Sequence, residues 1–326
     1  MEYNDFLSYI KESVSTIIGD ERQVNIHKVI KNNDIELDGL TIMSPDSNVS
    51  PTIYLNEYYE DYLRGVSIGD IVYDIYGVYE QQYKKIDFDL SFFADFEKVK
   101  GRLTAKLINY DSNQKLLSEV PHIRFLDLAI VFYCFVENDA FGDATVLIHT
   151  SHMQVWNVTT EELYRHSMIN TPLILPPVIT NMNEIIRELL VSKLQNQFIT
   201  SDSEDFDDID DMDFSFDIIA DNLLNVIGEE TSSSMYVLTN NHKTNGSICM
   251  LYKDVLKNFS NEVKSDLIIL PSSVHELILI PYSDDLSPAQ LSKMVKDVNT
   301  NEVDAIEVLS NHIYKYISKN DEIIIL

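Results

Sequence analysis

The residue types needed for hydrolase chemistry occur together in one short segment, 271–276, which reads Pro-Ser-Ser-Val-His-Glu from Pro271 to Glu276. A serine hydroxyl, an imidazole and a carboxylate are the groups that nucleophilic catalysis combines. In an extended chain, side chains two residues apart share a face. Ser273 and His275 can therefore approach each other, whereas Glu276 points to the opposite face and cannot orient the imidazole. The segment leads into an apolar strand and contains no G-x-S-x-G elbow, so it provides no helix N-terminus for an oxyanion.

Two interpretations of this segment remain open. The hydroxyl groups of Ser272 and Ser273 can bond the backbone of a turn, which makes the segment a structural hairpin. This is the preferred interpretation, and it assigns no catalytic residue. The alternative is a hydrolase-type enzyme centred on this hairpin, with Ser273, His275 and Glu276 as its catalytic candidates.

Other chemistries lack the spacing that they require. Leu279 stands where an H-E-x-x-H zinc motif needs its second histidine. His149 and His152 lie three residues apart with no cysteine or carboxylate placed to join them as metal ligands. No calcium-loop pattern fits the acidic run, and no glycine-rich phosphate loop occurs among only nine glycines. The sequence therefore predicts neither a metal nor a cofactor.

Tyrosines are unusually dense between Tyr54 and Tyr83. At about 100° per residue, Tyr73, Tyr76 and Tyr83 form a second stripe on a helix whose core stripe is already aliphatic. Exposed tyrosines are common at interfaces, so these three are the candidate binding residues. The alternative is that their rings pack against a neighbouring helix.

These residues must be positioned by strands and helices, and the pattern of those elements in the sequence predicts an α+β fold. The expected fold has two lobes, each a mainly antiparallel sheet with packed helices. Residues 267–270 and 277–280 are short apolar runs typical of buried strands on either side of the 271–276 hairpin. Over residues 217–326 the expected order is β-β-α-β-β-α-β, with a strand at 248–251. In the first lobe, Phe96, Val99, Leu103 and Leu107 are spaced as in a helix.

An acidic run divides the chain. Eight carboxylates fall within residues 201–213, and so many like charges repel one another rather than pack. The expected domains are an N-terminal α+β domain over 1–200, an acidic linker over 201–216 and a C-terminal α+β domain over 217–326.

Composition excludes several classes of function. The chain has 326 residues, 45% of them hydrophobic, which suffices for real cores, and its formal net charge is -29. Nucleic-acid binding needs clustered Lys and Arg, and an anionic membrane surface repels acidic proteins. The N-terminus lacks a basic region followed by an apolar run, and Cys134 and Cys249 are expected to be buried thiols rather than a disulfide. These features favour a cytoplasmic protein.

Several segments along the chain resemble a domain-of-unknown-function family of clostridial gut bacteria of the Lachnospiraceae type. The residues that carry the resemblance are 49–55, 91–96, 120–123, 125–133, 156–163, 170–172, 236–240 and 271–276. The similarity runs nearly end to end, with the acidic run as the variable part. This resemblance implies a bacterial origin and no particular activity.

The sequence thus favours a non-catalytic cytosolic module for protein interaction or regulation. Its partner would be another protein or a second copy of the chain. The hydrolase centred on the 271–276 hairpin remains the alternative.

Overall fold

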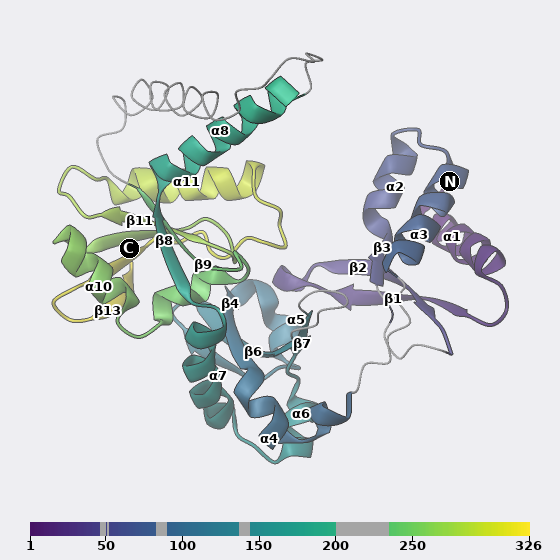
Figure 1. Cartoon of the computed structure of the whole chain (residues 1–326), viewed down its shortest axis with the longest axis horizontal. Helices are drawn as coiled ribbons and strands as arrows, with labels where there is room; N and C mark the ends of the chain where they lie inside the picture. The colour runs from purple at the N-terminus through teal and green to yellow at the C-terminus, as the bar shows by residue number, and fades with distance from the viewer. Residues whose placement is uncertain (46–49, 51, 83–89, 137–143, 200–234) are drawn as a thin grey trace, which may run out of the picture. The chain divides into compact units, whose positions relative to one another are not determined.

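The computed structural model confirms the α+β fold and describes residues 1–45, 50, 52–82, 90–136, 144–199 and 235–326 (Figure 1). Two compact units divide the chain. Unit 1 comprises Met1–Thr104, Tyr110–Ile123 and Val131–Ser167, and unit 2 comprises Ala105–Asn109, Arg124–Ile130 and Met168–Leu326. The proposed acidic linker lies outside the described residues.

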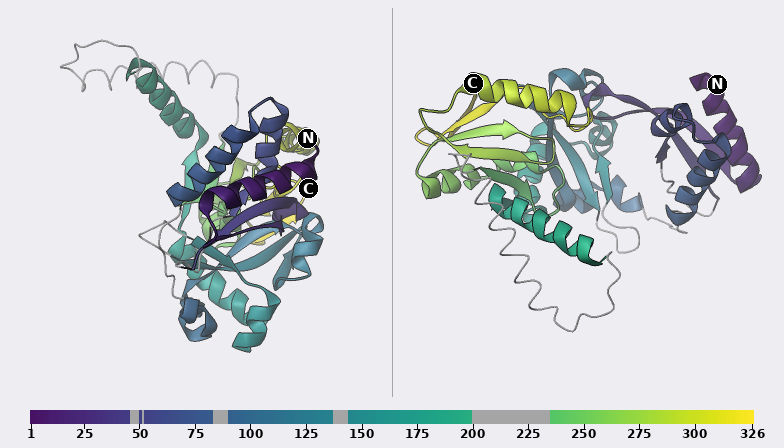
Figure 2. Two further views of the ribbon diagram at one scale, coloured as in Figure 1. Left: turned by 90° about the vertical axis from the view of Figure 1, so that its right-hand side faces the viewer. Right: turned by 90° about the horizontal axis from the view of Figure 1, so that it is seen from above.

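The first half of unit 1 is a three-stranded antiparallel sheet covered by helices. Strands β1 (Gln23–Ile30), β2 (Glu36–Met43) and β3 (Thr52–Tyr54) pair in that order. Helices α1 (Tyr3–Ile18), α2 (Leu55–Leu63) and α3 (Ile68–Gln82) pack on the face of the sheet that carries Leu40 and Ile42, as Figure 2 also shows. The apolar stripe of α1 explains this packing, because its side chains Phe6, Ile10 and Val14 are all fully buried.

The described residues among 90–174 form four α-helices and a four-stranded sheet of order β4-β6-β5, in which β7 also pairs with β6. The strands are β4 (Leu103–Asn109), β5 (His122–Phe125), β6 (Leu128–Val136) and β7 (Ala144–Leu147). The helices are α4 (Phe96–Val99), α5 (Gln114–Leu117), α6 (Thr150–Trp156) and α7 (Thr160–Ile174). The residues of these elements are divided between the ranges of unit 1 and unit 2.

The expected helix through Leu103 and Leu107 is wrong, because both residues lie in β4. Three consecutive β4 residues, Leu103, Thr104 and Ala105, are fully buried, so the strand is covered on both faces. A strand buried on both faces shows no alternation, and its leucines can match a helical spacing by chance.

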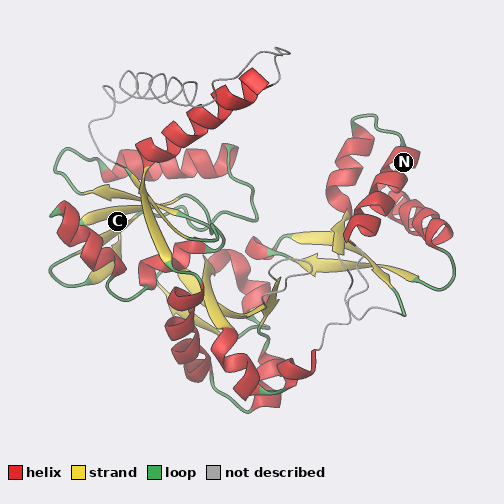
Figure 3. Ribbon diagram, viewed as in Figure 1, coloured by secondary structure: helices red, strands yellow, loops and turns green. Residues whose placement is uncertain are grey.

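Unit 2 is built on a six-stranded antiparallel sheet of order β13-β12-β10-β11-β9-β8, whose strands are yellow in Figure 3. The strands are β8 (Pro177–Asn181), β9 (Tyr236–Asn240), β10 (Leu267–Pro271), β11 (Leu277–Pro281), β12 (Tyr314–Ile317) and β13 (Glu322–Ile325). Helix α11 (Pro288–Asn301) packs on the face that carries Ile268 and Ile280. On strand β9, Tyr236 contacts Phe259 of α10 (Val255–Val263), with ring centroids 4.9 Å apart.

This sheet differs from the sequence expectation in two places. Residues 248–251, expected as a strand, belong to a 3-10 helix over Gly246–Leu251. Strand β8, which precedes α8 (Met182–Ile199), pairs with β9 over its whole length, so residues 168–199 join unit 2 rather than an N-terminal domain ending at 200. Pairing between strands distant in the sequence decides where residues 168–199 belong, and local composition does not report it.

The expected burial of the two cysteines is confirmed, and a Thr-x-x-Glu capping box opens α7. In this capping box, Thr159 N–H donates to Glu162 over 2.9 Å and Glu162 N–H donates to the Thr159 hydroxyl over 3.2 Å. Cys134 and Cys249 are free and buried, and burial raises the pKa of the Cys249 thiol to about 12. Within the described part of the chain, no helix combines the length and the apolar character that crossing a membrane requires.

Candidate functional site

The 271–276 segment is a hairpin loop between β10 and β11 whose hydroxyl groups bond within the loop. Ser273 Oγ accepts a hydrogen bond from the His275 backbone N–H at 3.0 Å. Ser272 Oγ donates to Glu276 Oε1 over 3.3 Å. Ser273 is 9% exposed, so its hydroxyl is largely withdrawn from solvent. These contacts are those of a side chain that supports a turn.

The His275 ring bridges the hairpin to two neighbouring segments. Its Nδ1 accepts the backbone N–H of Asn245 at 3.0 Å, so the neutral ring carries its proton on Nε2. The Nε2 atom lies 3.6 Å from Glu307 Oε1. The structure therefore places Ser273, His275 and Glu276 in one loop, with the imidazole nitrogens directed to Asn245 and Glu307. The hydrolase interpretation of this hairpin gains no support from that geometry.

The candidate tyrosines of α3 lie in different environments. Tyr73 is 70% exposed, whereas Tyr79 on the core stripe is 1% exposed. Tyr76 is partly exposed, and burial, followed by a hydrogen bond to Glu80, raises the pKa of its phenol. Tyr83 lies outside the described residues. The Tyr73 ring is thus a surface group on a helix whose opposite side fills the core.

Tyr73 lies on an exposed surface of α3 and its preceding turn, which we call the Tyr73 face. We define this face by five residues that lie on one side of the helix and its preceding turn. They are Val66, Gly69, Asp70, Tyr73 and Gly77. Val66 is 42% exposed, and nearby Leu63 is 58% exposed. The face therefore presents two apolar side chains, two glycines and the Asp70 carboxylate.

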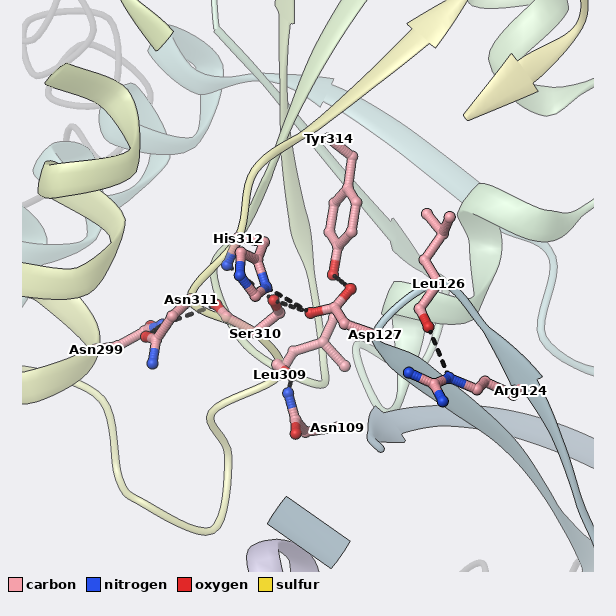
Figure 4. A network of polar contacts seen from close by, with 10 residues as sticks. All are labelled: Asn109, Arg124, Leu126, Asp127, Asn299, Leu309, Ser310, Asn311, His312 and Tyr314. Carbon is pink, nitrogen blue, oxygen red and sulfur yellow. Dashed lines mark hydrogen bonds and ion pairs between the residues drawn. The ribbon is translucent and has the colours of Figure 1, made fainter. Parts of the chain in front are cut away.

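A third polar site, which the sequence analysis did not identify, lies in unit 2 around Asp127 (Figure 4). Three side chains converge on this buried carboxylate. Ser310 Oγ donates to Asp127 Oδ2 over 2.6 Å, His312 Nδ1 lies 3.0 Å from the same oxygen, and Tyr314 Oη donates to Oδ1 over 2.8 Å. Burial, and then the Asp127 charge, raise the pKa of the Tyr314 phenol, so it remains a donor.

Local backbone geometry positions the carboxylate. Leu126 and Asp127 form the two-residue turn between β5 and β6, and Leu126 has a φ of 55°. Positive φ is costly for a bulky side chain, and glycine normally occupies such a turn position. The Leu126 carbonyl accepts a hydrogen bond from Arg124 Nε at 3.1 Å, which supports the strained turn. Backbone strain of this kind is found at positions that the surrounding contacts over-determine.

The Asp127 site has the arrangement of a carboxylate-oriented imidazole. A carboxylate only accepts hydrogen bonds, so the neutral ring of His312 places its proton on Nδ1 and leaves Nε2 as an acceptor. The His312 side chain is 54% exposed, while that of Asp127 is 10% exposed. The Ser310 hydroxyl is committed to Asp127, so the site offers a base rather than a serine nucleophile.

One sequence signal for this site existed. Ser310, His312 and Tyr314 alternate, so in an extended chain they share a face. Their common partner, however, lies 183 residues before Ser310. The neighbouring segment is held by Asn299, whose Nδ2 donates to the Ser310 carbonyl over 2.9 Å.

The two histidines considered as metal ligands, His149 and His152, cap a helix. The His149 N–H donates to His152 Nδ1 over 3.0 Å at the start of α6. Burial, followed by the neighbouring His149, lowers the pKa of His152. Among the described residues, no group of three or more His, Cys, Asp or Glu side chains is placed to hold a metal ion.

The fold and these sites together define an α+β protein of antiparallel sheets that carries an exposed aromatic helix face and the buried Asp127 network. The chain belongs to a family of unknown function, DUF5688, whose model matches residues 3–318. No curated protein matches the chain, and no solved structure matches it.

Proposed function

We propose that this protein is a non-catalytic interaction module that binds a protein partner through the Tyr73 face. The observation that carries the proposal is the 70% exposure of Tyr73 on a helix whose core face is complete without it. An aromatic ring contributes most binding energy when it moves from water into a partner's pocket. The two buried free thiols suit a reducing compartment such as the cytoplasm.

Replacing Tyr73 by alanine should abolish most partner binding and leave folding unchanged. Exposed substitutions alter the free energy of unfolding by about 0.5 kcal/mol or less, whereas loss of an aromatic anchor costs about 2 kcal/mol of binding. That cost corresponds to roughly a 30-fold weaker affinity. Thermal melting and capture of partners by the immobilised protein measure the two effects.

Tyr9→Ala is the matched control, since Tyr9 is a 44% exposed tyrosine on α1 of the same unit. It should retain capture. A large fall in melting temperature for Tyr73→Ala would show that the ring supports the core. Equal capture by both variants would eliminate this face as the binding surface.

A second candidate function is acid–base catalysis at His312, which the Asp127 geometry favours over the 271–276 hairpin. If the parent hydrolyses p-nitrophenyl acetate or p-nitrophenyl phosphate, His312→Gln should lower the rate by about 100-fold or more, the scale of a lost general base. His27→Gln, at an exposed histidine on β1, should retain the rate. An inactive parent, or full activity in His312→Gln, would contradict this candidate.

A further inference from the structure

We infer that the partner presents a basic amphipathic helix to the Tyr73 face. This inference rests on the proposed function and specifies its partner. Three features of the described residues carry it: the bare helix surface around Tyr73, the sign of the charges beside it, and a cavity next to Tyr76.

The surface around Tyr73 suits close approach by another helix. Gly69, Tyr73 and Gly77 are four residues apart and so lie on one side of α3. A Cβ added at Gly77 would meet nothing within 4 Å, and one at Gly69 would meet only Ser67 Oγ, at 3.8 Å. The packing of the chain itself therefore does not require either glycine, although each costs a helix about 0.5 to 1 kcal/mol relative to alanine. A glycine one turn before and one turn after the projecting ring leaves room for a helix lying along α3.

The charges beside this face disfavour binding of a second copy of the chain to it. From residue 55 to residue 82 the chain carries one cation, Arg64, which bonds Asp61 over 3.1 Å. It carries six carboxylates over the same residues, which are Glu57, Glu60, Asp61, Asp70, Asp74 and Glu80. A second copy would bring the same carboxylates against them, with a net charge of -29 on each chain. Lysines and arginines on the partner would instead complement this rim and accelerate association.

A cavity of about 370 Å³ adjoins Tyr76 at the C-terminal end of α1. Its lining includes three carboxylates, on Asp20, Glu21 and Glu80, and one cation, Arg22, which lies 3.7 Å from Glu80. The C-terminus of a helix also favours positive charge, and α1 has no basic residue in its last turn. A lysine or arginine side chain that extends from a helix on the Tyr73 face would find carboxylates and a tyrosine ring there.

A labelled 18-residue peptide tests this inference with the full-length protein. The peptide carries leucines at helical spacing and lysines elsewhere, and its control carries glutamates in place of the lysines. Fluorescence anisotropy should show binding of the basic peptide only. Its Kd should weaken about 10-fold or more between 50 and 300 mM salt, because both charged surfaces become screened.

Three variants and one control variant separate a specific face from general attraction to an acidic protein. Tyr73→Ala should weaken the affinity for the basic peptide about 30-fold. Gly77→Leu should weaken that affinity about 10-fold, because the leucine side chain fills the space above the glycine. Leucine is also the better helix former, so Gly77→Leu should melt no lower than the parent. Asp74→Asn keeps an acceptor for the Tyr58 hydroxyl but removes a charge, and it should weaken binding and reduce the salt dependence. Tyr9→Ala should bind as the parent does.

Two results would overturn the inference. One is equal binding of the basic and acidic peptides. The other is parental affinity for the basic peptide in both Tyr73→Ala and Gly77→Leu. If Tyr73-dependent capture of a partner persisted while either result held, the proposed function would stand and only the partner's chemistry would be wrong.

Discussion

Replacing Asp127 by alanine should lower the free energy of unfolding by about 3 to 5 kcal/mol. The carboxylate accepts from Ser310, His312 and Tyr314, and two of these donors, on Ser310 and Tyr314, are buried to 1% exposure or less. Without the carboxylate, each buried hydroxyl loses the oxygen to which it donates and cannot turn to bulk water. A buried donor left without an acceptor costs about 1 to 3 kcal/mol. Urea unfolding followed by circular dichroism measures the loss.

A graded series makes this prediction specific. Tyr314→Phe removes one donor and leaves the carboxylate bonded to Ser310 and His312. It should therefore lower the free energy of unfolding by only about 1 kcal/mol. Asp284→Ala, at an exposed loop position in the same unit, should change stability by about 0.5 kcal/mol or less. An Asp127→Ala protein as stable as Asp284→Ala would show that the network does not stabilise the fold. The strain at Leu126 would then favour a functional role for the site.

Replacing Gly246 by alanine should lower the free energy of unfolding by about 3 kcal/mol or more. An added Cβ would lie 2.5 Å from the His275 carbonyl oxygen and 2.9 Å from the Asn240 backbone nitrogen, and it would overlap Thr239 Oγ1. Overpacking a dense interior costs about 1 to 3 kcal/mol, and more where backbone must move. Movement here would break the 2.8 Å hydrogen bond that Thr239 Oγ1 donates to the His275 carbonyl.

Gly77→Ala is the matched control, because a Cβ at Gly77 meets nothing within 4 Å. It should raise stability by about 0.5 to 1 kcal/mol through helix propensity. The two glycine substitutions should therefore shift the melting temperature in opposite directions. If Gly246→Ala melted at the parental temperature, the loop around His275 would be adaptable, and the hydrolase interpretation of the hairpin would regain interest.

Much of the candidate site could be predicted where the signal is local. The strands on either side of the hairpin appear as β10 and β11, within one residue of the expected bounds. The start of α11 is also local, since the Ser287 hydroxyl accepts the Gln290 N–H three residues later. The stripe containing Tyr73 follows from helical geometry alone, and the structure places that ring in solvent.

The sequence by itself determined features that depend on neighbours a few residues apart. These are the α+β class, the hairpin at 271–276, the burial of the two cysteines and the acidic character of the chain. Periodicity, capping and turn chemistry all act within about one or two turns of chain, so composition and spacing report them.

The tertiary structure alone decided which distant groups meet. It joined Asp127 to Tyr314 across 187 residues, paired β8 with β9, and made Gly246 obligatory by placing it against the His275 carbonyl. It also converted the apolar run at Leu103 from an expected helix into a strand buried on both faces. Each outcome depends on the path of the whole chain, because packing against remote segments outweighs a local preference of about 1 kcal/mol or less.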